Sequence, residues 1–159
     1  MPRADDPADL LTDVVPRLYR VLRAALDEDP ELPSLEQLRV MTRIAQGVRH
    51  ASALATARQM RMSAITPLID ALVARGWVIR TPDPSDRRRA DLRLTPTGER
   101  ARRAARRRTR ARLREVLGHG AAASSGVDVA AVAIWLDGAL RRYDRHRLGP
   151  GGAGYGGDG

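Results

Sequence analysis

The stretch from Ser63 to Gly98 constrains the fold of this chain more than any other part of the sequence. Its first part repeats apolar residues with the spacing of an amphipathic helix, and Gly76 is placed to end that helix because glycine adopts the left-handed turn at low cost. Segments of alternating polarity at 77–81 and 91–95 then predict two short strands. Turn-forming prolines and aspartates separate the strands, together with three consecutive arginines. The apolar stripe of the helix consists of Ile65, Leu68, Ile69 and Leu72.

A helix followed by a hairpin with a cationic tip predicts a winged helix-turn-helix, in a chain that is otherwise mainly α-helical. Such a helix fits the major groove of DNA, and arginines at the tip of a hairpin fit the narrow, electronegative minor groove. Thr95 is placed to cap the helix that follows, with Pro96 at its first position. Within the second strand, Leu92 and Leu94 are expected to face one way and Asp91, Arg93 and Thr95 the other.

The two ends of the chain are also predicted to be helical. A helix is expected from Asp9 or Thr12 to Ala25. Pro16 is compatible with this helix if it begins near Thr12, because only the first turn accepts proline without losing a hydrogen bond. A last helix is expected at about 128–145, with an apolar stripe too large for a lone surface helix and a matching stripe on the first helix.

Three further helices lie between these ends. Ser34 and Gln37 have the spacing of a capping box, which predicts a helix that ends at Gly47. A short helix is expected at about 52–59 and a long one at 96–117. The short helix and the one before it would pack with the helix of the Ser63–Gly98 stretch as a three-helix core.

The net charge of +9 is concentrated in the middle of the chain. Residues 37–114 carry 20 arginines against 5 acidic residues, whereas residues 1–36 and 115–159 are mildly acidic. Together with the hairpin, this basic body predicts a nucleic acid as the partner. Nine arginines fall between Arg100 and Arg114. They either form a solvated helix face or, near the wing, contact phosphates without reading bases.

Other functional classes lack the residues that they need. There are no cysteines, which excludes disulfides, thiolate metal sites and thiol redox sensing. His50, His119 and His146 are scattered, and no nucleophile-elbow or phosphate-loop motif is present, so we expect no metal, no cofactor and no enzymatic activity. No apolar run is long enough to span a bilayer and no signal peptide is seen, so a cytoplasmic protein without membrane contacts is expected.

A family pattern runs through the winged region and is most specific in the wing. It consists of Leu54-Ala55, Ile65 with Leu68-Ile69-Asp70, Leu72, Arg75-Gly76 and Val78, and then Asp86-Arg87-Arg88, Leu94-Thr95 and Gly98 in the pattern D-x-R…L-T-x-x-G. By these residues the sequence resembles the MarR (multiple antibiotic resistance regulator) family of bacterial winged-helix transcription factors. By motif the resemblance covers roughly residues 35–105, and the flanking helices match by length and position only.

The resemblance implies a homodimer that binds double-stranded DNA. A two-fold dimer requires a pseudo-palindromic operator with half-sites about 10 base pairs apart. Arg88 corresponds to the wing arginine that enters the minor groove, and Asp86 to the acid that holds it in place. The predicted DNA-binding residues are Arg61, Ser63, Ala64, Thr66, Pro67, Asp86, Arg87, Arg88 and Arg89.

The same resemblance divides the chain, as a single domain over 1–159, into functional parts. The expected parts are a winged helix-turn-helix at 34–98, a long connecting helix at 96–117, dimerisation helices at 9–28 and 115–147, and a disordered tail at 148–159.

Three positions depart from the family pattern. Arg58 replaces a usual leucine, and Arg61 replaces a small capping residue, so Ser63 is the alternative cap and would shift the start of the recognition helix. Pro67 stands where many members carry a basic or polar residue. The outward face then lacks side chains for bidentate base contacts, and we expect thymine-methyl contacts and groove shape to carry more of the specificity.

Many family members bind a small phenolic or anionic molecule, which implies an effector site here. Tyr19, Arg23, Met41 and His50 are candidates for it. The predicted function is a DNA-binding transcriptional regulator, a repressor released by such a ligand. Two alternatives stay open: an architectural or weakly specific DNA-binding protein, and a protein-interaction module that kept the fold.

Overall fold

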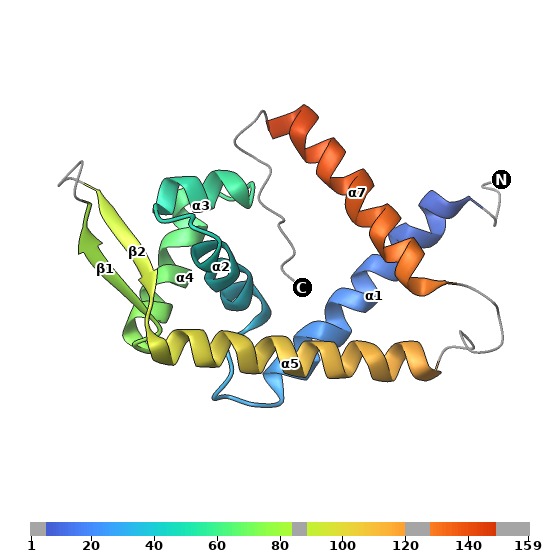
Figure 1. The fold of residues 1–159 in the computed structure, drawn as a ribbon, viewed down its shortest axis with the longest axis horizontal. Helices are drawn as coiled ribbons and strands as arrows, with labels where there is room; N and C mark the ends of the chain where they lie inside the picture. Colours follow the sequence, from blue (N-terminus) through green and yellow to red (C-terminus); the bar gives the residue numbers. More distant parts are fainter. Residues whose placement is uncertain (1–5, 84–88, 120–127, 149–159) are drawn as a thin grey trace.

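The computed structural model describes residues 6–83, 89–119 and 128–148, and these residues form helices and one hairpin (Figure 1). The predicted fold class, mainly α with a small β-hairpin wing, is confirmed. The elements are α1 (Pro7–Asp27), α2 (Leu35–Ala45), α3 (Ala51–Ala57), α4 (Met62–Ala74), β1 (Val78–Pro82), β2 (Ala90–Leu94), α5 (Pro96–His119) and α7 (Val129–Leu148).

The main core joins α2, α3, α4 and the hairpin. Ile65, Ile69 and Leu72 of the predicted stripe are fully buried in it, and Leu68 packs against it from a partly exposed position. Because these three side chains point into the core, the opposite face of α4 is exposed to solvent. The other buried members of this core are Val40, Met41, Ile44, Leu54, Ala55, Trp77, Val78 and Leu92.

A second, smaller core attaches α5 to the rest of the chain. In Figure 1, α5 runs from the base of the hairpin past α2 to α1, along one edge of the molecule. Ala105 in the middle of α5 is fully buried against Leu26 of α1 and Leu38 of α2. The long helix therefore connects the winged region to the N-terminal helix through one packed face.

The hairpin is antiparallel, with Val78 opposite Leu94 and Pro82 opposite Ala90. Its strands are displaced by one residue from the predicted segments at 77–81 and 91–95. The reason lies in Thr95, whose hydroxyl oxygen accepts a hydrogen bond from the Gly98 N–H at 2.9 Å. Thr95 thus starts α5 instead of continuing the strand, and its predicted capping role is confirmed.

The helix starts show which local signals are strong. The capping box of Ser34 and Gln37 is present with both hydrogen bonds, as predicted. The expected start of the first helix was wrong, because α1 begins at Pro7 and its cap is Asp6, which accepts from the Ala8 N–H at 2.8 Å. Pro16 consequently lies inside the helix and not in its first turn. The other helix bounds differ from the predicted ones by a few residues, as helix ends commonly do.

The terminal helices leave much apolar surface in solvent. Trp135 and Ile134 on α7 are 65% and 73% exposed, and α1 presents a stripe of exposed aliphatic residues. Even so, none of the helices in the described ranges is both long and apolar enough to cross a bilayer. The large apolar side chains exposed on α1, on the end of α5 and on α7 are Leu10, Leu11, Val14, Val15, Leu18, Tyr19, Val116, Leu117, Val132, Ile134, Trp135, Leu140 and Tyr143.

Gly98 lies so close to the backbone of Trp77 that no side chain fits. A Cβ built at Gly98 would stand 2.0 Å from the Trp77 carbonyl oxygen. We expect Gly98→Ala to lower the free energy of unfolding by about 3 kcal/mol or more, measured by chemical denaturation, because the clash is with backbone that cannot rotate away. Gly118→Ala is the matched control in the same helix, since no atom lies within 4 Å of its Cβ position. An equal loss in both variants would contradict this.

Candidate nucleic-acid interface

Helix α4 presents a small, weakly polar face to solvent. Its cap is Arg61, whose carbonyl accepts from the N–H groups of Ala64 at 3.0 Å and Ile65 at 3.2 Å. The alternative start at Ser63 is therefore wrong, because the extended backbone at Arg61 already begins the helix and Ser63 lies inside its first turn. Arg61 makes no side-chain cap. All five predicted contact residues in this region, Arg61, Ser63, Ala64, Thr66 and Pro67, are exposed.

The exposed face of α4 has few groups with which to read bases. The Thr66 hydroxyl donates to the Met62 carbonyl at 2.9 Å and so satisfies part of the helix backbone. Pro67 lies inside α4 and has no N–H to donate. The expectation that methyl contacts and groove shape outweigh bidentate hydrogen bonds stays a prediction.

The tip of the wing lies outside the described residues. Asp86, Arg87 and Arg88 therefore remain sequence-based predictions. Arg89 is described, and its guanidinium donates to the Ser52 hydroxyl of α3 at 3.2 Å, while its carbonyl accepts from the Asp83 N–H at 3.0 Å. The closing residues of the hairpin are thus fastened to the start of α3.

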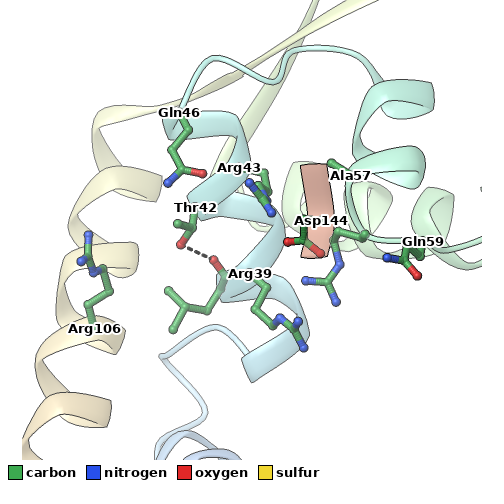
Figure 2. Close-up of a pocket in the computed structure, with 10 residues that line it drawn as sticks. Arg39, Thr42, Arg43, Gln46, Ala57, Gln59, Arg106 and Asp144 are labelled. Atoms are coloured by element: carbon green, nitrogen blue, oxygen red, sulfur yellow. Dashed lines mark hydrogen bonds between the residues drawn. The ribbon is translucent and has the colours of Figure 1, made fainter. Parts of the chain in front are cut away.

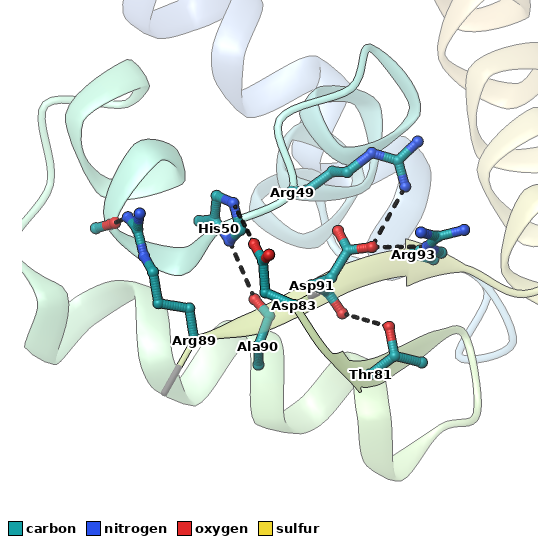
Figure 3. A network of polar contacts seen from close by, with 9 residues as sticks. Arg49, His50, Thr81, Asp83, Arg89, Ala90, Asp91 and Arg93 are labelled. Atoms are coloured by element: carbon teal, nitrogen blue, oxygen red, sulfur yellow. Dashed lines mark hydrogen bonds and ion pairs between the residues drawn. The ribbon is translucent and has the colours of Figure 1, made fainter. Parts of the chain in front are cut away.

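His50 fastens the base of the wing to the helical body (Figure 3). Its Nε2 lies 3.2 Å from a carboxylate oxygen of Asp83 and its Nδ1 lies 3.3 Å from the Ala90 carbonyl oxygen. Both ring nitrogens therefore face oxygen acceptors, and only a protonated imidazole can donate to both at once. One residue earlier, the Arg49 carbonyl accepts from the Leu92 N–H at 2.8 Å, so the segment before α3 is hydrogen-bonded to β2.

Asp91 is a buried acidic residue of the wing base that the sequence pattern misplaced. The alternation in β2 predicted an outward-facing side chain, but Asp91 is buried. Its carboxylate accepts from Arg93 Nε at 2.7 Å and lies 3.7 Å from the guanidinium of Arg49 (Figure 3). Arg49 is distant from Asp91 in the sequence, so no local pattern could indicate their contact. The contact with Arg93 could have been inferred, because Asp91 and Arg93 are two residues apart on one face of a strand.

Two further arginines fix the far end of α4. Arg80 of β1 reaches Asp70 of α4 at 2.5 Å. Arg75, which follows α4, stacks over the Trp77 ring at 3.8 Å from its centroid and donates to the Pro30 carbonyl at 2.9 Å. Helix α4 is therefore attached both to the wing and to the loop between α1 and α2.

A cavity of about 400 Å³ lies between α2, the end of α3, α5 and α7 (Figure 2). Its charged lining consists of Arg39, Arg43, Arg58 and Arg106 with Asp144 as the acid. The Arg58 side chain is buried and pairs with a glutamate of α2, which explains how an arginine fits where the family usually has leucine. The excess of guanidinium groups makes this cavity suited to an anion.

None of the four candidate effector residues lines this cavity, and only Tyr19 and Arg23, one turn apart on α1, are neighbours. The Tyr19 hydroxyl donates to Glu36 at 2.7 Å, which raises the pKa of Tyr19 above its ordinary value. Arg23 forms an ion pair within α1, Met41 is buried in the main core, and His50 lies at the base of the wing. The structure does not bring these side chains together as one site.

The arginines of α5 divide into structural and exposed groups. Arg102 donates to Glu99 at 2.7 Å and Arg103 at 2.8 Å, and these contacts lower the pKa of Glu99 to about 2. Arg108 and Arg112 point toward the body of the protein, and both pair with Glu28 at the end of α1. These two arginines therefore fit neither predicted role, which was a solvated helix face or a set of phosphate contacts.

Comparison with known proteins identifies the winged region. The sequence model of the MarR family matches residues 34–90, which include α2, α3, α4, β1 and the loop of the hairpin. The winged-helix region is therefore similar to that of the MarR family. No curated protein sequence matches the chain.

Solved MarR-family structures match over most of the chain. CouR from Rhodococcus jostii RHA1, bound to p-coumaroyl-CoA, is 25% identical with a TM-score of 0.68, over 88% of this chain and 92% of CouR. The multiple antibiotic resistance repressor MarR is 23% identical with a TM-score of 0.73, over 87% and 97%. The repressor CouR bound to a 23-mer DNA duplex is 21% identical with a TM-score of 0.69, over 85% and 92%. MarR-family members of this fold are transcriptional regulators and not enzymes.

The contact between His50 and Asp83 should stabilise the base of the wing. In a double-mutant cycle of His50→Ala and Asp83→Ala, we expect a coupling free energy of about 1 kcal/mol, because each single substitution removes the same contact. Chemical denaturation measures each variant. Fully additive effects of the two substitutions would refute the assignment.

Proposed function

We propose that the chain is a dimeric, sequence-specific DNA-binding transcriptional regulator that acts as a repressor. The observation that carries this proposal is the combination of an exposed face on α4 with a wing whose base is fastened at His50 and Asp91. Together they form a two-part contact surface of the kind that places a helix in the major groove and a hairpin in the adjacent minor groove.

The charge distribution supports DNA as the partner. The winged region and α5 contain 20 of the arginines with only 5 acidic residues between positions 37 and 114. Arginines at the wing tip, where Arg88 occupies the family's minor-groove position, would enter a groove of enhanced negative potential. Repression, as named for MarR and CouR, is the regulatory direction that these relatives favour.

The exposed apolar residues of α1 and α7 support a homodimer. In Figure 1 these two helices cross at the side of the view opposite the hairpin, and α7 runs from there back toward α3. Their exposed large side chains form more apolar surface than a monomer ordinarily leaves in water. A second copy of the chain would bury this surface and set two recognition helices at a fixed separation.

A charge introduced into this apolar surface should separate the protomers. Ile134→Glu is expected to shift the protein from dimer to monomer at micromolar concentrations in sedimentation equilibrium, because a carboxylate cannot be buried in an apolar interface without a partner. Ala111→Glu places the same charge on an exposed position of α5 away from α1 and α7 and should leave the dimer intact. A wild-type protein that is already monomeric would refute the proposed dimer.

An anionic small molecule is the effector that the structure favours. The cavity between α2, α3, α5 and α7 has four arginines in its lining, and CouR, a structural relative, binds p-coumaroyl-CoA. Because the cavity spans the winged region and the terminal helices, an occupant would contact both Arg43 of α2 and Arg106 of α5. Occupancy would then alter the orientation of α4 relative to the dimer and weaken DNA binding.

A gel-shift series with the DNA upstream of the coding sequence tests the main proposal. We expect one discrete high-affinity site, and Arg88→Ala should weaken binding to it by about 1–3 kcal/mol, the range for a good groove contact. Arg17→Ala on the exposed side of α1 is the control and should bind as the wild type does. Equal binding to every duplex would favour an architectural protein, and no binding at low salt would favour a protein-interaction module.

A further inference from the structure

Five arginines form a continuous ridge along α5. Arg100, Arg103, Arg107, Arg110 and Arg114 recur at intervals of three and four residues, which places them within an arc of about 80° on the helix surface. All five are exposed. The ridge extends for about 21 Å, the rise of a helix between its first and last members.

The ridge points away from the molecule. Ala105, which is fully buried against α1 and α2, lies on the opposite side of the helix from the middle of the ridge. Ala104 and Ala111 border one side of the ridge, whereas Glu99, Arg106 and Leu117 border the other. Arg100 and Arg107 also line an open groove together with Arg75, which follows α4, and Glu31.

Acidic partners are distributed unequally between the two sides of α5. The inward arginines Arg108 and Arg112 pair with Glu28 of α1. On the ridge, Arg103 pairs with Glu99, and the other four members have no acidic partner within the described ranges. Like charges three and four residues apart destabilise a helix. The sequence therefore neutralises the arginines that pack against the body and leaves a self-repelling row on the outside.

We propose that this ridge is a second phosphate-binding surface, which holds duplex DNA without regard to sequence. The proposal rests on the DNA-binding function proposed above and adds a contact outside α4 and the wing. About 21 Å of duplex carries roughly six phosphates on each strand, so a straight row of five guanidinium groups matches the charge density of one strand. A protein partner is disfavoured because the ridge has no large apolar side chain to form the centre of an interface.

Salt-dependent binding of a random-sequence duplex tests the ridge. The variant R107Q/R110Q removes two exposed ridge charges, and R17Q/R20Q removes two exposed charges with the same spacing from α1. We expect R107Q/R110Q to reduce the slope of log affinity against log salt by about 1.8, the value for two lost phosphate contacts, and the control to leave it nearly unchanged. Fluorescence anisotropy with the full chain measures both.

The outcomes separate this inference from the proposed function. If R107Q/R110Q and R17Q/R20Q have the same salt slope, the ridge is not a DNA contact, whether or not the wild type prefers one operator. If the ridge variant alone has the reduced slope but no duplex is preferred by the wild type, the ridge stands and sequence-specific regulation fails. If the ridge variant keeps its DNA affinity but loses affinity for polyglutamate, the partner is an acidic polypeptide and the proposal is overturned.

Discussion

The close approach of α5 to Trp77, just after α4, is the constraint on which the other elements depend. Gly98 lies directly against the Trp77 carbonyl, and Thr95 donates its N–H to the same carbonyl at 3.0 Å and its hydroxyl to the Gly76 carbonyl at 2.7 Å. These contacts close the hairpin and start α5 at one point. The end of α4, the origin of the wing and the direction of the long helix are therefore fixed together.

The sequence predicted those parts of the fold that depend on local chemistry. The inward stripe of α4, the capping box at Ser34 and the cap at Thr95 each need only a few neighbouring residues, and each is present. The buried position of Asp91 and the bonding of His50 to the wing could not be predicted. Both depend on the segment before α3 lying against β2. That contact joins residues some forty positions apart, and no local sequence pattern indicates it.

Arginine serves different physical purposes in this chain according to what surrounds it. With a nearby carboxylate it joins elements, as Arg112 does between α5 and α1 and Arg80 does between β1 and α4. Arg43 is buried in the wall of the cavity, where solvent screens its charge less than it screens the charge of an exposed arginine. Composition alone could indicate an affinity for polyanions but could not divide the arginines among these purposes.

The contacts of Arg75 have a mechanical consequence. The side chain stacks on Trp77 and donates to the carbonyl groups of Pro30 and Leu32, so it connects the loop after α1 to the residue that ends α4. A tilt of α1 would pull on that loop, and the guanidinium would transmit the displacement to the C-terminal turn of α4. The position of the loop after α1 and the position of the C-terminal turn of α4 are therefore linked through one side chain.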